Sequence, residues 1–363
     1  MSKTKIAVLT GGGDAPGLNA VIYSLTRACL NTMDCELIGY KFGYRGLYLN
    51  DYIPLTMEST TGILHIGGTM LYASNKDNLF DYLVEENGKM VKKDVSNVAV
   101  ENMKKEGVDV LVVLGGDGTL TSARDFSRKG VNVIGVPKTI DNDLASTDQT
   151  FGFDSAVNIV TENLGRLHTT IKSHNRIMVV EVMGRSAGWI ALQSGIAGSA
   201  DVILIPEIPY SIDKVVEKIE ERDARGRFFT IIVVTEGAKP IHGEASVGKF
   251  VADSPDPIRF GGIAAKIATE LEGRVNHEIR SCALGHIQRG GDTSAFDRIL
   301  SIRYGVEAAR LIKERQFGNM VTLRGNQMCN DSLENVIGAK SKQVDPNGEL
   351  VKAARLIGIS FGD

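Results

Sequence analysis

The side chains best suited to chemistry lie in residues 137–143, Pro-Lys-Thr-Ile-Asp-Asn-Asp, directly after the apolar run 131–136. Two carboxylates, a lysine and a threonine hydroxyl occur together there. Phosphoryl transfer to an alcohol needs a base for the hydroxyl proton and cations for the oxygens in transit. Asp141 is a candidate for the base and Lys138 for the cation. The alternative interpretation is a run of turn residues that caps the next element.

Two glycine-rich corners also follow apolar runs. Residues 10–17 read Thr-Gly-Gly-Gly-Asp-Ala-Pro-Gly, and residues 115–119 read Gly-Gly-Asp-Gly-Thr. Glycines let a phosphate approach the backbone, Asp117 can hold magnesium, and a helix beginning near Gly118 would direct free N–H groups at phosphate. A tight turn with a capping aspartate is the alternative. Three such corners predict one site at the carboxyl edge of a parallel sheet.

Basic residues stand at the ends of apolar runs in the second half of the chain. They are Arg176, Arg185, Arg280, His286 and Arg289. Arginine binds phosphate through two parallel N–H groups, so several arginines that converge predict a pocket for an anionic substrate. One such arginine by itself is usually solvated, and one such histidine is as often structural.

The elements that position these corners alternate between strand-like and helical runs, which predicts an α/β fold with parallel sheets covered by helices. The expected helices cover about 18–30, 95–106, 121–129, 155–170, 189–197 and 258–271. Residues 75–78 and 85–89 are expected to form an exposed excursion and 238–257 a polar loop. A second lobe is expected to begin near residue 151, and the tail from about residue 317 to pack onto it.

Bulk properties exclude several classes of protein. The chain has 363 residues, 43% of them hydrophobic, and a net charge of −3, which gives no electrostatic footprint for nucleic acid or a membrane surface. No apolar run approaches the length of a bilayer span. The four cysteines are scattered, which is typical of buried free thiols in a reducing compartment. Because residues 1–5 lead directly into a strand-like run, no signal peptide is expected, and we predict a cytoplasmic protein.

Taken together, the motifs resemble those of the phosphofructokinase A family over about residues 5–310. Besides the three corners, the matching segments are Gly-Gly-Thr at 67–69, Val-Met-Gly-Arg at 182–185, Val-Thr-Glu-Gly at 234–237 and Leu-Gly-His-Ile-Gln-Arg-Gly-Gly at 284–291. The resemblance implies two Rossmann-like three-layer lobes with the active site between them. The donor-phosphate lobe would comprise 1–150 plus about 288–305, and the sugar-phosphate lobe 151–287 plus about 306–363. It also implies a homotetramer or homodimer whose subunits share active sites.

The resemblance assigns roles to individual residues for transfer of a phosphoryl group to the 1-hydroxyl of fructose 6-phosphate. Asp141 would be the base and Asp117 would bind magnesium. The phosphoryl group in flight would be stabilised or oriented by Thr139, Arg185, Lys138 and Asp143. The donor phosphates would lie along Gly13, Lys76, Gly116, Gly118 and Thr119. The sugar phosphate would contact Met183, Gly184, Glu236, His286 and Arg289, with Arg176 and Arg280 reaching in from a neighbouring subunit.

Members of the family use either ATP or pyrophosphate as the phosphoryl donor, and residues of this chain match both groups. An aspartate at the position of Gly118 would repel the α-phosphate of ATP, so glycine favours ATP. Lys138 is typical of members that use pyrophosphate, and Asn75 replaces a donor-side arginine of many members. We predict ATP as the donor, with pyrophosphate as the alternative. An NAD or lipid kinase, suggested by Gly-Gly-Asp-Gly-Thr alone, and a non-catalytic nucleotide-sensing subunit are more remote alternatives.

Regulation is the last property that the resemblance addresses. The effector site of regulated bacterial members uses several arginines, and this chain has Tyr23, Asp51 and His168 at three of those positions. Replacing three cations, one of them by an anion, should weaken binding of a nucleotide diphosphate or phosphoenolpyruvate. We therefore predict weak or absent control by those effectors.

Overall fold

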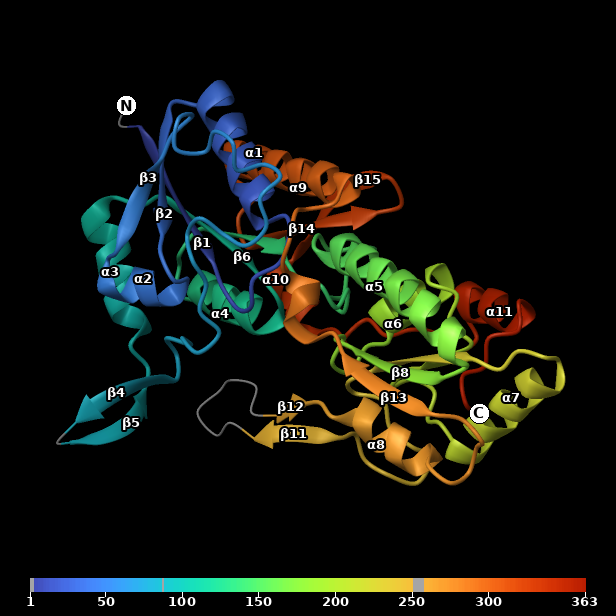
Figure 1. Cartoon of the computed structure of the whole chain (residues 1–363). Coiled ribbons are helices and arrows are strands. Elements are labelled where there is room, and N and C mark those ends of the chain that lie inside the picture. The colour runs from blue at the N-terminus through green and yellow to red at the C-terminus, as the bar shows by residue number, and fades with distance from the viewer. Residues whose placement is uncertain (1–2, 87, 251–257) are drawn as a thin grey trace.

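The computed structural model describes residues 3–86, 88–250 and 258–363, and it shows two α/β lobes side by side (Figure 1). Each lobe has a central sheet of parallel or mostly parallel strands with helices on both faces. The predicted fold class is confirmed. Two short antiparallel hairpins project from this framework, β4 (Tyr82–Glu86) with β5 (Lys89–Lys93) and β11 (Val247–Phe250) with β12 (Ile258–Phe260).

The first sheet has seven strands in the order β15-β14-β7-β6-β1-β2-β3. Their bounds are β1 Thr4–Thr10, β2 Cys35–Tyr40, β3 Tyr52–Leu55, β6 Val110–Gly115, β7 Val133–Pro137, β14 Asn319–Arg324 and β15 Gln327–Ser332. Only the two edge strands, β3 and β15, run antiparallel to their neighbours. The glycine-rich corners and the Lys138 corner therefore leave the same edge of the sheet, as the sequence predicts.

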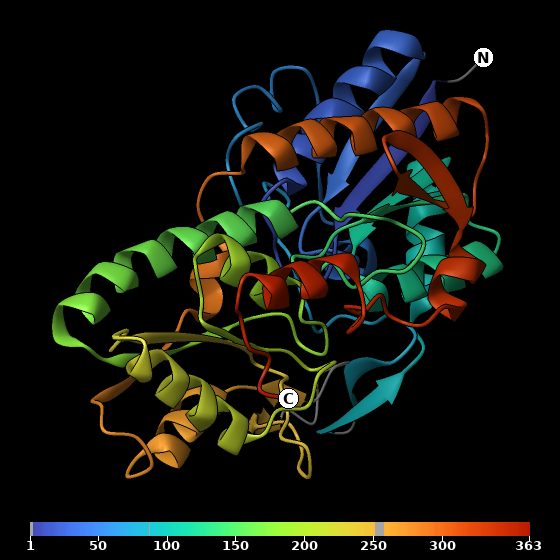
Figure 2. The same ribbon diagram turned by 90° about the vertical axis from the view of Figure 1, so that its right-hand side faces the viewer.

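Alternation along the strands creates the three layers of this lobe. Ile6 and Val8 face α1 (Leu18–Thr32) and α9 (Ala295–Lys313), which run alongside each other (Figure 2). Ala7 and Leu9 face the opposite core. That core is covered by α2 (Tyr44–Leu49), α3 (Ser96–Glu106), α4 (Asp117–Arg128) and α10 (Leu333–Gly338). Because successive side chains of a strand point to opposite faces, one apolar run supplies both cores.

The second sheet is wholly parallel, in the order β13-β8-β10-β9. Its strands are β8 Ile177–Val182, β9 Val202–Leu204, β10 Thr230–Thr235 and β13 Ile279–Ala283. One face packs on α5 (Phe153–His174), α6 (Trp189–Ala197) and α11 (Glu349–Leu356), and the other on α7 (Ile212–Ala224) and α8 (Ile263–Leu271). The 3-10 turn η1 (Gly285–Arg289) follows β13 and leads back toward the first lobe.

The tail differs from the expectation that residues from about 306 pack onto the second lobe. Helix α9 continues to Lys313 against α1, and β14 and β15 extend the first sheet, with Asn319 paired to Ile134. The reason is that Met320 and Val321, on opposite faces of β14, complete the two cores of the first lobe. Only the last part of the tail, from Val344 onward, joins the second core.

Smaller differences concern the excursions. The β4–β5 hairpin overlaps the segment expected as an exposed excursion and extends past it to Lys93, and the expected polar loop contains β11. The helix predicted from 258 begins at Ile263, after β12. Residues 251–257 of the predicted loop lie outside the described residues. All four cysteines are free thiols, as predicted, but Cys29 and Cys35 are buried whereas Cys282 and Cys329 are only partly buried. Within the described ranges, no helix is both long and apolar enough to cross a bilayer.

Candidate active site

The candidate site is built from strand ends of both lobes. The first lobe contributes residues 11–16 after β1, the start of α4 after β6, and residues 138–143 after β7. The second contributes residues 183–185 after β8, Glu236 after β10, and η1 after β13. Arg289 of η1 connects the two sets, since its Nη1 donates to the backbone oxygen of Asp14 at 3.0 Å. The lobes therefore meet at the edge where the candidate residues lie.

Asp141 lies at the centre of a tightly held turn. Its backbone N–H donates to Thr139 Oγ1 at 3.1 Å, and Thr150 Oγ1 donates to the backbone oxygen of Thr139 at 2.7 Å. The next residue, Asn142, has a left-handed backbone (φ 52°), and its side-chain oxygen accepts from the backbone N–H of Thr150 at 3.1 Å. The turn fixes the Asp141 carboxyl group while its Oδ1, buried, has no hydrogen-bond partner among the described residues. A buried acceptor that is unpaired costs free energy, so this oxygen is poised to take a proton donor.

The electrostatic surroundings of Asp141 suit a base. Burial and then the negative charge of Asp143 raise the pKa of Asp141 to about 6. Arg289, Arg185 and Lys138 oppose that rise. The carboxyl group is thus mostly ionised near neutral pH but is a stronger base than an exposed aspartate. Arg185 follows β8 of the second lobe, and Arg289 lies in η1, which follows β13.

Lys138 connects the turn that carries Asp141 to the first glycine-rich corner. Its ammonium group is buried and donates to the backbone oxygen of Gly13 at 2.5 Å. Burial, and then the positive charge of Arg289, lower the pKa of Lys138 to about 8. The side chain therefore carries most of a positive charge at neutral pH, directly beneath the loop of residues 12–14.

The carboxylates of Asp117 and Asp143 repel each other electrostatically. Asp117 is the first residue of α4 and is exposed. Partial desolvation and then the charge of Asp143 raise the pKa of Asp117, whereas Arg185 and Arg124 lower it. Carboxylate oxygens that repel each other are suited to a divalent cation, and hard cations such as Mg²⁺ prefer oxygen ligands. The residues present therefore fit a magnesium ion held by Asp117.

The other residues of the Gly-Gly-Asp-Gly-Thr corner play different parts. A Cβ atom added at Gly118 would meet no other described residue within 4 Å. By contrast, a Cβ atom added at Gly116 would lie 3.3 Å from the backbone oxygen of Lys138. Thr119 is buried, and a Cβ on Gly115 would lie 2.3 Å from the Thr119 side chain. Thr119 thus packs between strand ends, although its predicted role was to contact donor phosphate.

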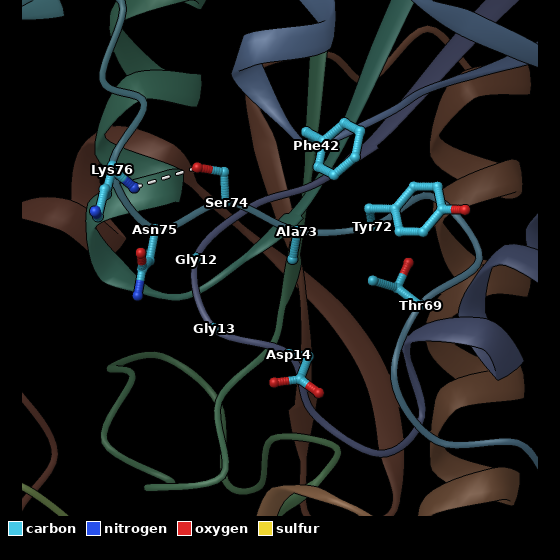
Figure 3. A pocket seen from close by; sticks show the side chains of 10 residues that line it. All are labelled: Gly12, Gly13, Asp14, Phe42, Thr69, Tyr72, Ala73, Ser74, Asn75 and Lys76. Carbon is cyan, nitrogen blue, oxygen red and sulfur yellow. Dashed lines mark hydrogen bonds between the residues drawn. The ribbon is translucent and has the colours of Figure 1, made fainter. Parts of the chain in front are cut away.

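A cavity of about 550 Å³ lies beside the first glycine-rich corner (Figure 3). Its lining residues are Gly12, Gly13, Asp14, Phe42, Thr69, Tyr72, Ala73, Ser74, Asn75 and Lys76. The backbone N–H of Gly12 donates to the backbone oxygen of Ser74 at 3.0 Å, which holds the two walls together. Two of the predicted donor-binding residues, Gly13 and Lys76, share this space. The backbone of Gly12 and Gly13 and the side chain of Lys76 are the parts of the lining suited to a phosphate, whereas the Asp14 carboxylate is not.

Sequence reasoning missed an aromatic pair in the same cavity. The rings of Phe42 and Tyr72 are stacked, with centroids 4.8 Å apart and planes 11° from parallel. Figure 3 shows them together at one end of the cavity and Lys76 at the other. Both residues have a left-handed backbone with φ of 57°, which is unusual for aromatic side chains. Their separation in the chain gives no local pattern that could have revealed the pair.

In the second lobe, side chains hold the backbone at the residues predicted to contact the sugar phosphate. The backbone N–H of Met183 donates to Gln288 Oε1 at 3.2 Å, and that of Arg185 donates to Glu236 Oε1 at 3.1 Å. Burial, and then the charge of Asp141, raise the pKa of Glu236 to about 7. Gly184, with φ of 139°, supplies a backbone conformation that other residues rarely adopt. His286, in η1, is exposed.

Two predicted residues do not reach this site within one chain. Arg176 precedes β8 whereas Arg185 follows it, so six strand residues, or about 20 Å at about 3.3 Å per residue, separate them. Arg176 and Arg280 both pair with Glu278 at the opposite edge of the sheet. Their predicted contact with a sugar phosphate therefore requires another subunit.

Comparison with known proteins identifies the family. A family model described as phosphofructokinase matches residues 5–312. A Clostridium perfringens protein named ATP-dependent 6-phosphofructokinase 2 is 70% identical over 361 residues, covering 99% of this chain and 98% of that protein. An Amycolatopsis methanolica protein named pyrophosphate–fructose 6-phosphate 1-phosphotransferase is 44% identical, covering 94% of this chain and 96% of that protein.

A solved structure agrees with these matches. Phosphofructokinase from Saccharomyces cerevisiae has a TM-score of 0.78 and 30% identity, and the match covers 92% of this chain and 45% of the yeast chain. The family resemblance predicted from the motifs is confirmed by the family match and by the relatives. The chain described here belongs to the phosphofructokinase family.

Proposed function

We propose that the chain is an ATP-dependent 6-phosphofructokinase, which transfers the γ-phosphoryl group of ATP to the 1-hydroxyl of fructose 6-phosphate and so forms fructose 1,6-bisphosphate. The observation that carries the proposal is the buried, unpaired Oδ1 of Asp141, on which the negative charge of Asp143 and the positive charges of Arg289, Arg185 and Lys138 act. A base held among cations is what phosphoryl transfer to an alcohol requires. The name of the 70%-identical relative supports the same activity.

In the proposed reaction Asp141 accepts the proton of the 1-hydroxyl group of the sugar, and the oxygen of that hydroxyl group attacks the γ-phosphorus of ATP. The bond from that phosphorus to the oxygen of the leaving ADP breaks. Lys138, Thr139 and Arg185 stabilise the charge on the transferring group, and Asp143 orients the turn. Met183, Gly184, Glu236, His286 and Arg289 hold the sugar phosphate. Positioning and charge neutralisation supply most of the rate in this class of reaction.

Magnesium is the cofactor that the carboxylates of the first lobe would hold. Asp117 is the proposed ligand, because its pKa is raised by partial desolvation and by the charge of Asp143, a repulsion that a divalent cation would relieve. Bound magnesium would neutralise charge on the donor phosphates. Isothermal titration of Mg²⁺ with ADP into the parent and into Asp117→Asn tests this role, and equal affinities in the two proteins would exclude it.

For the donor, two observations point in different directions. The open space at Gly118 leaves room for the α-phosphate of ATP, and the 70%-identical relative is named for ATP. Lys138 adds a cation that favours a compact pyrophosphate, and a 44%-identical relative is named for pyrophosphate. We propose ATP as the donor, because available space is a requirement whereas an added cation is only a preference. Assays of both donors with magnesium test the choice, and faster turnover with pyrophosphate would reverse it.

The catalytic role of Asp141 is tested by Asp141→Asn, which keeps the shape of the side chain and removes the base. We expect turnover to fall by on the order of 100-fold or more while fructose 6-phosphate still binds. Arg166→Gln, at an exposed arginine of α5 that pairs with Glu162, is a control that should retain activity. Turnover in Asp141→Asn equal to that of the parent would leave the chain only a binding role.

We further propose that the active enzyme is a homodimer or homotetramer in the cytoplasm. Arg176 and Arg280 lie too far from Arg185 to serve the site of their own chain, and would complete a neighbour's sugar-phosphate pocket. Mixing inactive Asp141→Asn with inactive Arg280→Ala tests this sharing, because a mixed oligomer contains one site with both residues intact. Recovery of activity on mixing would support active sites shared between subunits, and no recovery would contradict them.

A further inference from the structure

A short segment of the C-terminal tail crosses from one lobe to the other beside the candidate site. It comprises residues 341–344, here called the strap, and lies between α10 on the first lobe and α11 on the second (Figure 1). None of the strap residues was singled out by the sequence motifs. The strap is notable because its hydrogen bonds reach both the turn that carries Asp141 and the loop that follows Arg185.

On the first lobe, the strap holds the catalytic turn through Asp143 and Asn142. The backbone N–H of Lys342 and the hydroxyl of Ser341 both donate to the backbone oxygen of Asp143, at 2.8 and 3.0 Å. The Lys342 ammonium donates to Asn142 Oδ1 at 3.0 Å. That side-chain oxygen also accepts from Thr150, so Lys342 fixes the residue whose left-handed backbone shapes the turn.

The Lys342 ammonium group has its full set of hydrogen bonds. Besides Asn142 it donates to the backbone oxygens of Thr147 and Asp148, at 3.0 and 2.7 Å. An ammonium has three N–H groups, so all three are used. Burial lowers the pKa of Lys342 to about 8, which still leaves most of the side chains protonated at neutral pH.

On the second lobe, the same segment holds the loop that begins at Arg185. The backbone N–H of Val344 donates to Glu207 Oε1 at 2.9 Å, and the Glu207 carboxylate also accepts from the backbone N–H of Gly188 at 2.9 Å. The indole N–H of Trp189 donates to the backbone oxygen of Lys342 at 3.1 Å. Four consecutive residues thus join the two halves of the site.

We propose that Lys342 is a positioning residue, through which the strap sets the distance between the Asp141 turn and the Arg185 loop during phosphoryl transfer. Lys342 acts through Asn142 and Asp143. The inference rests on the proposed kinase function. Misplacement of reacting groups by about 1 Å can reduce a rate by on the order of 100-fold, so a device that fixes this distance affects turnover more than binding.

The experiment compares Lys342→Met, Lys342→Arg and the control Lys340→Met. Methionine keeps much of the apolar stem and removes the three donors, arginine restores a cation with several donors, and Lys340 is an exposed lysine two residues away. We expect kcat to fall at least ~10-fold in Lys342→Met with both KM values within about threefold, to recover partly in Lys342→Arg, and to stay unchanged in Lys340→Met.

Hydrogen exchange gives a readout that does not depend on activity. In Lys342→Met, the backbone amides of residues 139–150 and 184–189 should exchange faster, and those of β1 and β10 should not. Ser341→Ala, which removes one bond at an exposed position, should show the same pattern more weakly even if Lys342→Met does not fold. Unchanged kcat in the folded variants, or faster exchange throughout the chain, would overturn the proposal. If the parent protein has no kinase activity but Lys342→Met still shows this local exchange pattern, the proposed function is rejected and the structural role of the strap is supported.

Discussion

Gly118 offers the sharpest test of how the donor is selected. It is the second residue of α4, and a Cβ atom added there meets no described residue within 4 Å. Aspartate therefore fits at this position without displacing a neighbour. It also replaces a flexible glycine in the first turn of a helix, where a negative charge is favoured. We expect Gly118→Asp to fold at least as stably as the parent.

The same carboxylate should repel a nucleotide. At about 5 Å from the α-phosphate and an effective dielectric of about 20, two unit charges repel by about 3 kcal/mol. That energy corresponds to a loss of kcat/KM for ATP on the order of 100-fold. Pyrophosphate has no group at the position of the α-phosphate, so its use should change by no more than a few-fold. The variant should therefore shift the donor preference toward pyrophosphate.

Steady-state assays with each donor, at saturating fructose 6-phosphate and magnesium, measure this shift. Gly118→Asn is the matched control, because asparagine has nearly the same shape and no charge. Equal losses for Asp and Asn would show that space, not charge, limits ATP. No loss in either variant would mean that the nucleotide does not pass Gly118, and the argument from open space would be refuted.

Four further outcomes are expected. The carboxylate form of Asp141 is the proposed base, and burial raises its pKa to about 6. We therefore expect kcat/KM to be highest well above pH 6 and to fall as the pH drops through about 6. A flat pH profile from 5 to 8 would contradict this. Gly237→Ala would place a Cβ 1.9 Å from the backbone oxygen of Arg185, so thermal unfolding should show a loss of about 2 kcal/mol or more, together with lower turnover. Ser294 Oγ accepts from the backbone N–H of Asp297 at the start of α9, so Ser294→Ala should cost about 1 kcal/mol in urea unfolding. ADP and phosphoenolpyruvate should leave the affinity for fructose 6-phosphate unchanged. A strong shift of that affinity by either compound would show that the chain has a working effector site.

The strand-end corners were predictable because they depend on local patterns. An apolar run followed by glycine, carboxylate and hydroxyl places those groups at the carboxyl edge of a parallel sheet, and Asp117 and Asp141 lie there. The resemblance added the residues of the second lobe, of which Arg185 and Arg289 do act on Asp141. Local pattern and family motif together recovered the core of the candidate site.

What the sequence did not reveal depends on contacts between distant segments. Strand β14 joins the first sheet because both its faces complete existing cores, a property that its own pattern does not specify. Phe42 and Tyr72 meet only because two loops are brought together. Thr119 belongs to a phosphate-binding motif, yet its side chain fills the space left by Gly11 and Gly115. Lys342 lies 200 residues from Asn142 and follows the region that carries the motifs.

The chain contains one tryptophan, Trp189, which donates its indole N–H to the strap. The Lys342 ammonium lies 5.7 Å from the centroid of its ring. Indole emission is sensitive to nearby charge and to contact with water. The molecule therefore carries an intrinsic optical probe at the junction of its two halves. Mixing the protein with each substrate in a stopped-flow fluorimeter would report directly whether, and how fast, that junction rearranges before turnover.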